Sequence, residues 1–285
     1  MIFEHEIPSG SKLYFGKSAK IKREIEAKAS TLLEELSFEE IVTPIFSYHQ
    51  HDAFDDVSEL IRLNDAGNHT VTLRADSTPD VFRIATKRLA RSQENKKWFY
   101  IQPTLAFPTK ECYQIGGEII DGNFEEILNV TMKIFDAIKI EPVLQIANIK
   151  IPQLLHEKYG VSLQALKLMQ IEKILDSKHT WIKELAAIQS FEDLQDTSKY
   201  PKDIADELAL MREKAKKITY AHIIFSPLYY AKMRYYKSLI CRMFSGNALL
   251  AMGGEYTIED TKAAGFAIYS DECIAMRLRT YEEIH

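Results

Sequence analysis

The stretch that decides the fold is WFYIQPTLAFPTKECYQIGGEII, residues 98–120. Residues 98–102 and 113–120 are rich in aromatic and β-branched side chains, a composition typical of strands. The middle, PTLAFPTKEC, carries two prolines, which favour a loop. The sequence therefore predicts two strands joined by a proline-marked loop at 103–112.

Upstream of this stretch, the pattern alternates between helix and strand. Apolar residues recur at helical spacing over 20–36, which predicts an amphipathic helix. FEEIVTP, residues 38–44, reads as a strand ended by proline. Residues 63–73 predict a hairpin around an Asp-Ala-Gly-Asn turn. A helix should follow, with Ser77 or Thr78 as its N-cap.

Downstream, Asn123 is expected to cap another helix, and residues 142–147 to form a strand. Residues 151–217 change to short Leu-, Lys- and Glu-rich helical patterns. Strands return at 221–227, 234–244, 247–253 and 262–270, and a short helix starts at Asp271. This order predicts an α+β fold with a mainly antiparallel sheet. We expect a discontinuous core of residues 1–150 and 218–285, with a helical insertion at 151–217.

Composition excludes several classes of protein. The 285 residues are 46% hydrophobic and 27% charged, as in soluble globular proteins. A net charge of -5 argues against a large nucleic-acid surface. Three cysteines without a CxxC pair favour a reducing compartment. No secretory signal or apolar run of about 18 residues is present, so we expect a cytoplasmic protein without membrane or nucleic-acid partners.

Two motifs resemble ligand sites but lack the required spacing. GSKLYFGKS has five residues between Gly10 and Gly16, whereas a phosphate-binding P-loop needs four. His49, His51 and Asp52 are not followed by further ligands at the spacing of a known metal motif. The signatures GxSxG, HExxH and GxGxxG are absent. We therefore expect neither a cofactor nor a metal.

Six segments, taken in order, resemble the catalytic core of class II aminoacyl-tRNA synthetases, specifically the histidyl branch. FEEIVTP resembles the first family motif, TLRADSTPDVFR the L-R-P-E-G-T segment, and residues 98–120 the second motif. RYYKSLICRMF and AMGGEYT resemble the two histidine-specific peptides, and KAAGFAIYSDECIAM lies where the third motif is expected. The resemblance implies a class II synthetase-like antiparallel sheet flanked by helices, and a homodimer that buries residues 38–44.

Four arginines of that family are replaced in this chain. Ala106 and Glu272 stand at the motif-two and motif-three positions, which in active synthetases hold ATP with fixed positive charge. Ala231 stands at the arginine of the first histidine peptide, and Glu255 at that of the second. The resemblance therefore implies a chain that does not adenylate an amino acid. The chain also ends soon after the third motif, so we expect no anticodon-binding domain.

The framework of an amino-acid pocket is retained. Gln114 and Glu118 keep the Q-x-G-x-E pattern, Asp76 replaces the glutamate of L-R-P-E, and Thr78 matches the threonine. Tyr235 and Tyr236 match the paired tyrosines, and Gly253 and Gly254 the paired glycines. The resemblance implies a histidine pocket built from Asp76, Thr78, Gln114, Glu118, Tyr235 and Tyr236, with Arg234 or Lys232 as a substitute cation. The alternative is that these residues only complete the sheet and its turns.

A histidyl-synthetase core without these arginines resembles the regulatory subunits of ATP phosphoribosyltransferase. That resemblance implies a non-catalytic chain in histidine biosynthesis. It would join the short-form catalytic subunit in a hetero-octamer, support its activity and take part in feedback inhibition by histidine. Two alternatives remain open: a divergent synthetase-like ligase and another synthetase-derived accessory subunit, such as a polymerase processivity subunit. Fold alone does not separate them.

Overall fold

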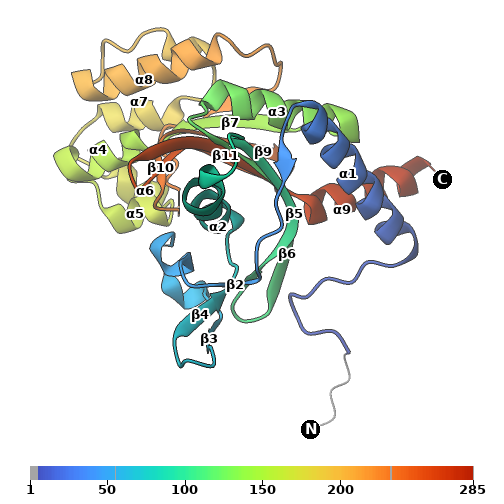
Figure 1. Ribbon diagram of the computed structural model, residues 1–285. Coiled ribbons are helices and arrows are strands. Elements are labelled where there is room, and N and C mark those ends of the chain that lie inside the picture. Colours follow the sequence, from blue (N-terminus) through green and yellow to red (C-terminus); the bar gives the residue numbers. More distant parts are fainter. Residues whose placement is uncertain (1–5, 55, 232, 285) are drawn as a thin grey trace.

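The computed structural model describes residues 6–54, 56–231 and 233–284 (Figure 1). Its centre is a mixed sheet in which most neighbouring strands are antiparallel, while the pairs at the two edges are parallel. The strand order is β1 (Glu39–Glu40), β5 (Lys97–Ala106), β6 (Lys110–Ile120), β11 (Thr261–Tyr269), β10 (Ala248–Ile258), β9 (Tyr236–Ser245), β7 (Val143–Asn148) and β8 (Ile223–Phe225). This arrangement confirms the predicted α+β class.

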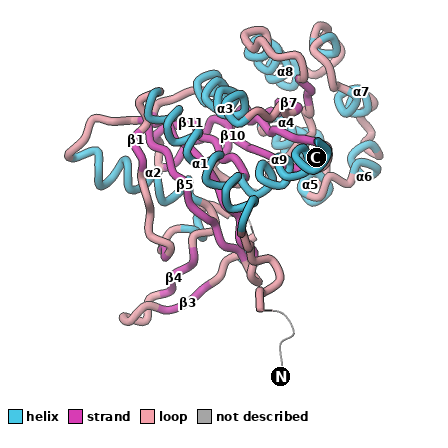
Figure 2. Tube along the Cα trace, turned by 90° about the vertical axis from the view of Figure 1, so that its right-hand side faces the viewer, coloured by secondary structure: helices cyan, strands magenta, loops and turns pink. Residues whose placement is uncertain are grey.

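One face of the sheet is covered by three helices, α1 (Gly16–Glu35), α3 (Phe124–Ile138) and α9 (Ser270–Ile284). Figure 2 shows them on the same side of the strands. Side chains alternate along a strand, so every second residue of β5, β6 and β11 points toward these helices. Phe99, Ile115 and Phe266 are buried on this face and share one core with Ile25 and Leu33 of α1. The opposite face carries the polar residues described below.

The start of α3 shows how local sequence fixes an element. The Asn123 side chain accepts a hydrogen bond from the Glu126 amide at 3.0 Å, and the Glu126 carboxylate accepts one from the Asn123 amide at 3.0 Å. This reciprocal pair is a capping box, which satisfies two otherwise unpaired backbone donors. The predicted cap at Asn123 is confirmed.

The segment 151–217 is helical, as its periodicity predicts. It contains most of α4 (Lys150–Tyr159) and all of α5 (Leu163–Lys167), α6 (Ile171–Leu175), α7 (Trp181–Ala187) and α8 (Lys202–Ala215), and every residue of it is described without a strand. In Figure 1 these helices lie toward the side of the sheet that carries β7, which with β8 forms one edge in the strand order. Leu208 and Met211 share the main core with Leu144 and Ile146 of β7. That this segment is a separate unit stays a prediction.

A small sheet extends below the main one and is made of β2 (Phe46–Ser47), β4 (Thr70–Leu73) and β3 (Arg62–Asn64). It contains the predicted hairpin, with β3 antiparallel to β4. In the turn between β3 and β4, the Asp65 side chain accepts hydrogen bonds from the amides of Gly67 and His69. Among the described residues, no helix is both long and apolar enough to cross a membrane.

The prediction of a loop at residues 103–112 is wrong. β5 runs through Pro103 to Ala106 and β6 begins at Lys110, so only three residues, 107–109, connect them. Strand β1 pairs with β5 only at Trp98 and Phe99, which leaves the same edge of β5 without a strand partner at Pro103. Because proline is tolerated at such an edge, its missing N–H does not end the strand. Arg74 donates two hydrogen bonds to the Pro103 carbonyl, at 3.0 and 2.8 Å.

The strand predicted at 38–44 is shorter than expected. Only Glu39 and Glu40 pair with β5, and the Ile41 amide adds one bond to the Phe99 carbonyl. The Thr43 amide then donates to the Gln102 side chain at 3.2 Å instead of a backbone carbonyl. A buried side chain therefore replaces the strand pairing that the sequence pattern suggested.

Candidate functional site

The candidate site occupies the sheet face opposite α1, α3 and α9. Gln114 and Glu118 lie an odd number of positions from Ile115, whose side chain faces the helices, so both point to the other face. Glu118 pairs with Trp98 on one side and with Gly265 on the other. Helix α2 (Ser77–Arg83) lies over this face in Figure 1 and brings Asp76 and Thr78 toward the strands.

Asp76 caps α2, so the predicted cap at Ser77 or Thr78 is wrong. Its carboxylate accepts the Thr78 amide at 3.1 Å and the Tyr235 hydroxyl at 2.6 Å. An aspartate at this position satisfies a free amide of the first turn and favours the helix dipole. Burial raises the pKa of Asp76, against the opposing effect of the Tyr235 and Thr78 hydrogen bonds.

Glu118 is completely buried and surrounded by hydroxyl groups. Thr78 donates to one carboxylate oxygen at 2.7 Å and Tyr256 donates to the other at 2.8 Å, while Tyr100 lies at 3.5 Å. Burial raises the pKa of Glu118 to about 8, although the Thr78 and Tyr256 hydrogen bonds act in the opposite direction. A Cβ on Gly265 would lie 1.8 Å from the Glu118 carboxylate, so only glycine leaves room for it. Because its pKa is raised to about 8, the Glu118 side chain is mostly protonated at neutral pH.

A second layer of polar residues supports Asp76, and sequence reasoning missed it. The Gln50 side-chain oxygen accepts a hydrogen bond from the Asp76 amide at 2.8 Å. Its side-chain nitrogen donates to the Asp76 carbonyl and to the Asp80 carboxylate, each at 2.8 Å. Ser47 donates to the other Asp80 oxygen at 2.6 Å. The signal available in the sequence is the polar run around Gln50, whose histidines and aspartate suggest metal ligands instead of a support for Asp76. Among the described residues, no group of three or more His, Cys, Asp or Glu side chains is arranged to hold a metal.

The structure brings four of the six predicted pocket residues into one hydrogen-bonded cluster, made of Asp76, Thr78, Glu118 and Tyr235. Tyr236 is buried and packs its ring 4.8 Å from that of Tyr235. Gln114 lies on the same face, and its buried Oε1 has no hydrogen-bond partner among the described residues. Tyr256 and Tyr100 belong to the cluster but were not predicted; both occur in quoted motifs.

The replaced arginine positions fall on different parts of the fold. Ala106 is the last residue of β5, on the site face, and Ala231 is buried near Tyr235. Glu255 instead points to the opposite face, where it accepts the Phe124 amide at 2.9 Å. Glu272 lies in the first turn of α9. Of the two predicted substitute cations, Lys232 lies outside the described residues, and Arg234 precedes β9 and donates its amide to Ala53.

A second polar group on this face surrounds Arg242 of β9. Its guanidinium donates to the Gln145 side chain at 2.9 Å and stacks 4.0 Å from the Tyr229 ring centroid. The guanidinium carbon also lies 4.6 Å from the centroid of the Phe244 ring. In contrast to the buried carboxylates, Arg242, Gln145 and Tyr229 are only partly buried. This part of the face is therefore reached by solvent.

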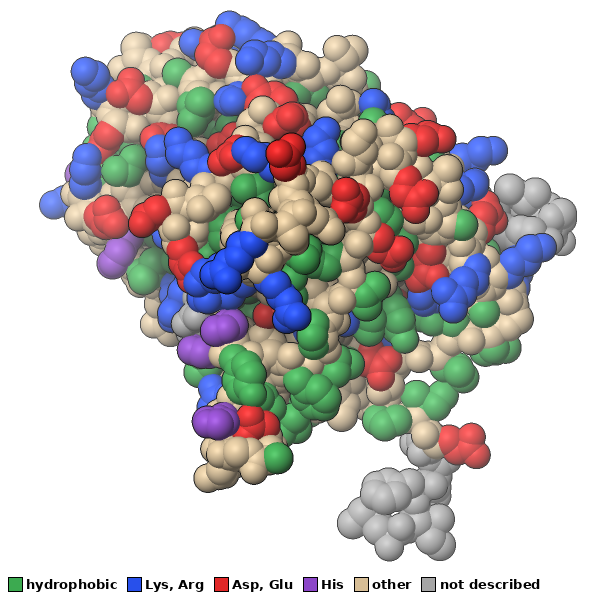
Figure 3. All heavy atoms as spheres, in the orientation of Figure 1, with side chains coloured by type: hydrophobic (Ala, Val, Ile, Leu, Met, Phe, Trp, Pro, Cys, Tyr) green, Lys and Arg blue, Asp and Glu red, His purple; other side chains and the backbone are tan. Residues whose placement is uncertain are grey.

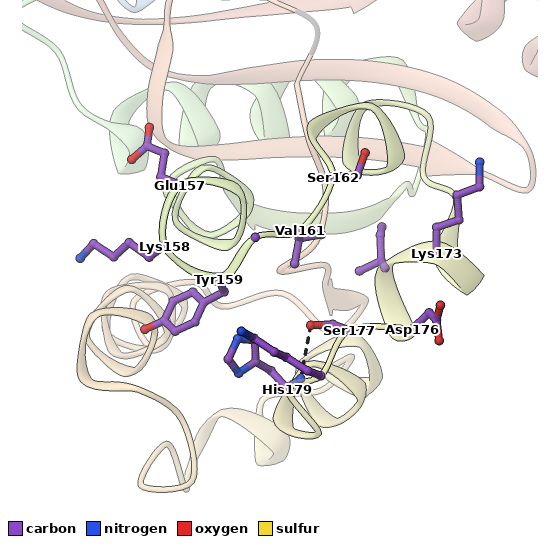
Figure 4. Close-up of a pocket in the computed structure, with 12 residues that line it drawn as sticks. Glu157, Lys158, Tyr159, Val161, Ser162, Lys173, Asp176, Ser177 and His179 are labelled. Atoms are coloured by element: carbon purple, nitrogen blue, oxygen red, sulfur yellow. Dashed lines mark hydrogen bonds between the residues drawn. The ribbon is translucent and has the colours of Figure 1, made fainter.

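The surface outside the site offers further features. Figure 3 shows basic side chains gathered over the region of α2, where Arg83 and Lys87 bind Glu259 at 3.1 and 2.7 Å. A depression of about 810 Å³ lies between α3 and the end of α8, and another of about 640 Å³ lies among α4 to α7. In the second, shown in Figure 4, the Tyr159 and His179 rings lie 5.4 Å apart. Neither depression is lined by a predicted pocket residue.

Comparison with known proteins gives consistent results. The sequence profile of the histidyl-tRNA synthetase family matches residues 15–273. A protein of Wolinella succinogenes, named ATP phosphoribosyltransferase regulatory subunit, is 44% identical over 99% of both chains. A protein of Helicobacter hepaticus with the same name is 41% identical over 96% of this chain and 98% of its own.

Solved structures support the fold. A histidine–tRNA ligase subunit from Alicyclobacillus acidocaldarius superposes with a TM-score of 0.80 over 99% of both chains, at 20% identity. A Bacillus halodurans structure, titled as an ATP phosphoribosyltransferase regulatory subunit/histidyl-tRNA synthetase, gives 0.82 over 96% of this chain and 83% of its own, at 16% identity. At such identities the likeness concerns the fold alone, and the predicted class II synthetase-like architecture is confirmed.

Proposed function

The chain belongs to the family of ATP phosphoribosyltransferase regulatory subunits, and from this premise we propose that it is a non-catalytic partner of a separate catalytic chain. The observation that carries the proposal is identity of 41–44% to two regulatory subunits over nearly the full length of each chain. The family places the protein in histidine biosynthesis. The proposed compartment is the cytoplasm, which the three free cysteines favour.

The chemistry of the site face supports a role without catalysis. Stabilising a triphosphate and the developing pyrophosphate requires fixed positive charge. Ala106 ends β5 with a methyl group, and Glu272 places a carboxylate in the first turn of α9. The carboxylates of Asp76 and Glu118 are already bound by hydroxyl groups of the chain itself. We infer that this face of the sheet binds an amino acid as a regulatory signal but does not activate it.

The proposed assembly pairs this chain with the short-form catalytic subunit in a hetero-octamer built on homodimers of the regulatory chain. Two-fold symmetric contacts are the commonest way for a chain to close a self-complementary surface. In this assembly the regulatory chain raises the activity of its partner. Histidine bound to the site face would contribute to feedback inhibition.

Reconstitution tests the proposal. The chain and a short-form catalytic subunit from the same organism are purified separately, and transfer of the phosphoribosyl group to ATP is followed for each alone and for the mixture. We expect activity of the mixture to exceed that of the catalytic subunit alone at least tenfold, with the two chains co-eluting in gel filtration. The control is bovine serum albumin at the same concentration.

The ligase alternative has its own assay. ATP–pyrophosphate exchange is measured for this chain alone with each of the twenty amino acids. We expect no exchange above background, because the ATP-binding arginines are absent. Histidine-dependent exchange, together with no stimulation of the catalytic subunit, would replace the regulatory proposal with the ligase.

A further inference from the structure

Positive charge is concentrated in one stretch of an otherwise acidic chain. Residues 83–97 hold six of the 36 basic residues but only one, Glu94, of the 41 acidic residues. This stretch begins at the end of α2, the region over which Figure 3 shows basic side chains gathered. A local excess of one sign on a chain of net charge -5 attracts a partner of the opposite charge.

Arg88 and Arg91 are exposed, and neither side chain has a partner in the part of the chain that the structure describes. Their neighbours Arg83 and Lys87 share the Glu259 carboxylate, at 3.1 and 2.7 Å. One carboxylate therefore compensates two cations, while the two arginines beside them are left uncompensated. A free guanidinium presents its donors as a fork that matches a carboxylate.

The backbone that carries these arginines is ordered and has an unusual form. Helix α2 continues into a π-helical turn at Ile84–Arg88 and then into a 3₁₀ turn at Leu89–Arg91. π-helical turns are rare and occur frequently at functional sites. Ala85 shares a buried cluster with Trp98 and Tyr100 of β5, which fixes this segment to the sheet. Docking on such a segment avoids the entropy cost of ordering a loop.

The two elements joined by this ion pair also hold the buried Glu118. In the first turn of α2, Thr78 donates to one Glu118 oxygen at 2.7 Å, and Arg83 ends the same helix. Glu259 lies in the turn between β10 and β11, and Tyr256 of β10 donates to the other Glu118 oxygen at 2.8 Å. A partner that docks over Arg83 therefore contacts the elements that position the buried cluster.

We propose that residues 83–91 are the surface on which an acidic face of the catalytic subunit docks, with Arg88 and Arg91 as its free cations. The inference rests on the proposed regulatory function and names the part of this chain that meets the partner. The catalytic subunit is the fitting occupant because a regulatory signal must leave the buried cluster, and here the elements that hold the cluster reach the surface.

The charge distribution favours a protein over a nucleic acid. A nucleic acid presents a long row of phosphates, and proteins that bind one neutralise several of them with basic side chains. Outside residues 83–97 acidic residues outnumber basic ones, so the positive charge does not extend along the chain. Two free guanidinium groups instead match a small group of carboxylates on a protein surface.

The test measures association of the full chain with the short-form catalytic subunit by biolayer interferometry, at about 50 and about 300 mM NaCl. We expect the double variant Arg88→Glu, Arg91→Glu to associate about 10–100-fold more weakly than wild type at the lower salt concentration, mainly through a slower association rate. The difference should shrink at the higher concentration, because salt screens exposed charges.

Two further double variants make the result specific. Lys178→Glu, Lys183→Glu is the matched control, because it reverses two exposed lysines of the helical insertion, and we expect wild-type association. Arg88→Gln, Arg91→Gln removes the same charges without adding carboxylates. Its association should be intermediate, and it is measurable even if the charge-reversed variant folds poorly.

Glu259→Gln predicts a change in the opposite direction. It removes the carboxylate that compensates Arg83 and Lys87, so the patch becomes more positive. We expect association with the catalytic subunit to become about two- to fivefold tighter at low salt. Unchanged or weaker association of this variant would contradict the docking surface.

Several outcomes would overturn the inference. One is wild-type association of the variant reversed at Arg88 and Arg91, and another is an equal loss in the control reversed at Lys178 and Lys183. A third is a gel shift of a single-stranded RNA that the reversal at Arg88 and Arg91 abolishes while association with the catalytic subunit is unchanged. A wild type that does not associate with the catalytic subunit overturns the regulatory proposal as well. Stimulation by wild type and by the reversed variant alike overturns the docking surface alone, so the two failures are distinguishable.

Discussion

Glu118 combines full burial with hydrogen bonds from Thr78 and Tyr256. Water is excluded from the carboxyl group, and the neutral form is favoured because no cation of the described chain compensates a charge there. In the native state its pKa is about 8, against 4.5 when unperturbed. The same burial that orders the cluster thus makes its stability depend on pH.

Stability should fall as pH rises from about 4.5 to about 8. In this range the native state retains the Glu118 proton that the unfolded chain releases, so the stabilisation is complete below pH 4.5 and is lost through pH 8. Glu118→Gln removes the titration, and the fall in unfolding free energy between pH 5 and 8.5 should shrink by about 2–4 kcal/mol. Urea unfolding at several pH values measures this.

Glu39→Gln is the control for that experiment, since it also removes one carboxylate but from an exposed position in β1. Its pH profile should parallel that of wild type. A Glu118→Gln profile parallel to wild type would contradict the assignment of the raised pKa to Glu118.

The residues of the candidate cluster were predictable only in part. Asp76, Thr78, Glu118 and Tyr235 lie in local motifs, so a resemblance of short segments was sufficient to find them. Gln50 belongs to no such motif, and Arg242 lies within RYYKSLICRMF at a position to which the resemblance assigns no role. They reach the site through tertiary packing and strand register, which a linear pattern does not encode.

At the scale of elements, α3 rests on a cap that the sequence identified correctly. Asn123 and Glu126 satisfy each other's backbone amides at 3.0 Å, and the helix buries Ile127, Ile134 and Ile138 against the sheet. The local capping residues and the stripe of apolar residues both indicate a helix that begins after Asn123. Such agreement is the reason that this helix was predicted at its observed start.

Asn123→Ala should lower the unfolding free energy by about 1 kcal/mol, because the Glu126 amide loses its acceptor at the helix start. Chemical denaturation with urea measures the change. Asn129→Ala, an exposed asparagine within the same helix, is the matched control and should differ from wild type by less than about 0.5 kcal/mol. Equal effects of the two variants would refute the capping role.

Strands were predicted less accurately than helices, and β5 shows why. Proline at 103 is a local signal for a loop, but its cost depends on whether the N–H would have had a strand partner. Only the neighbour, β1, determines this, and β1 ends its pairing at Phe99. The length of β5 is therefore a property of the sheet and not of the local sequence.

At the scale of the whole molecule, the two faces of the sheet have separate roles. The helix-covered face forms the main apolar core, and the other face carries the carboxylates, tyrosines and Arg242. Edge strand β1 is left with an exposed apolar segment directly after it, in which Val42 is 75% and Phe46 57% exposed. Large apolar side chains grouped at an edge are typical of an interaction surface.

We predict that this segment is the core of the homodimer, so that Val42→Asp weakens self-association at least tenfold. The substitution would place a charge in an apolar interface, where the lost hydration of the carboxylate is not repaid. Sedimentation equilibrium over a range of micromolar concentrations measures the dissociation constant. Val143→Asp is the matched control, because Val143 is a partly exposed valine in β7, near the opposite edge of the sheet. A monomeric wild type, or a Val42→Asp variant that dimerises as wild type does, would contradict this prediction, and the octamer would then have to be built on another contact.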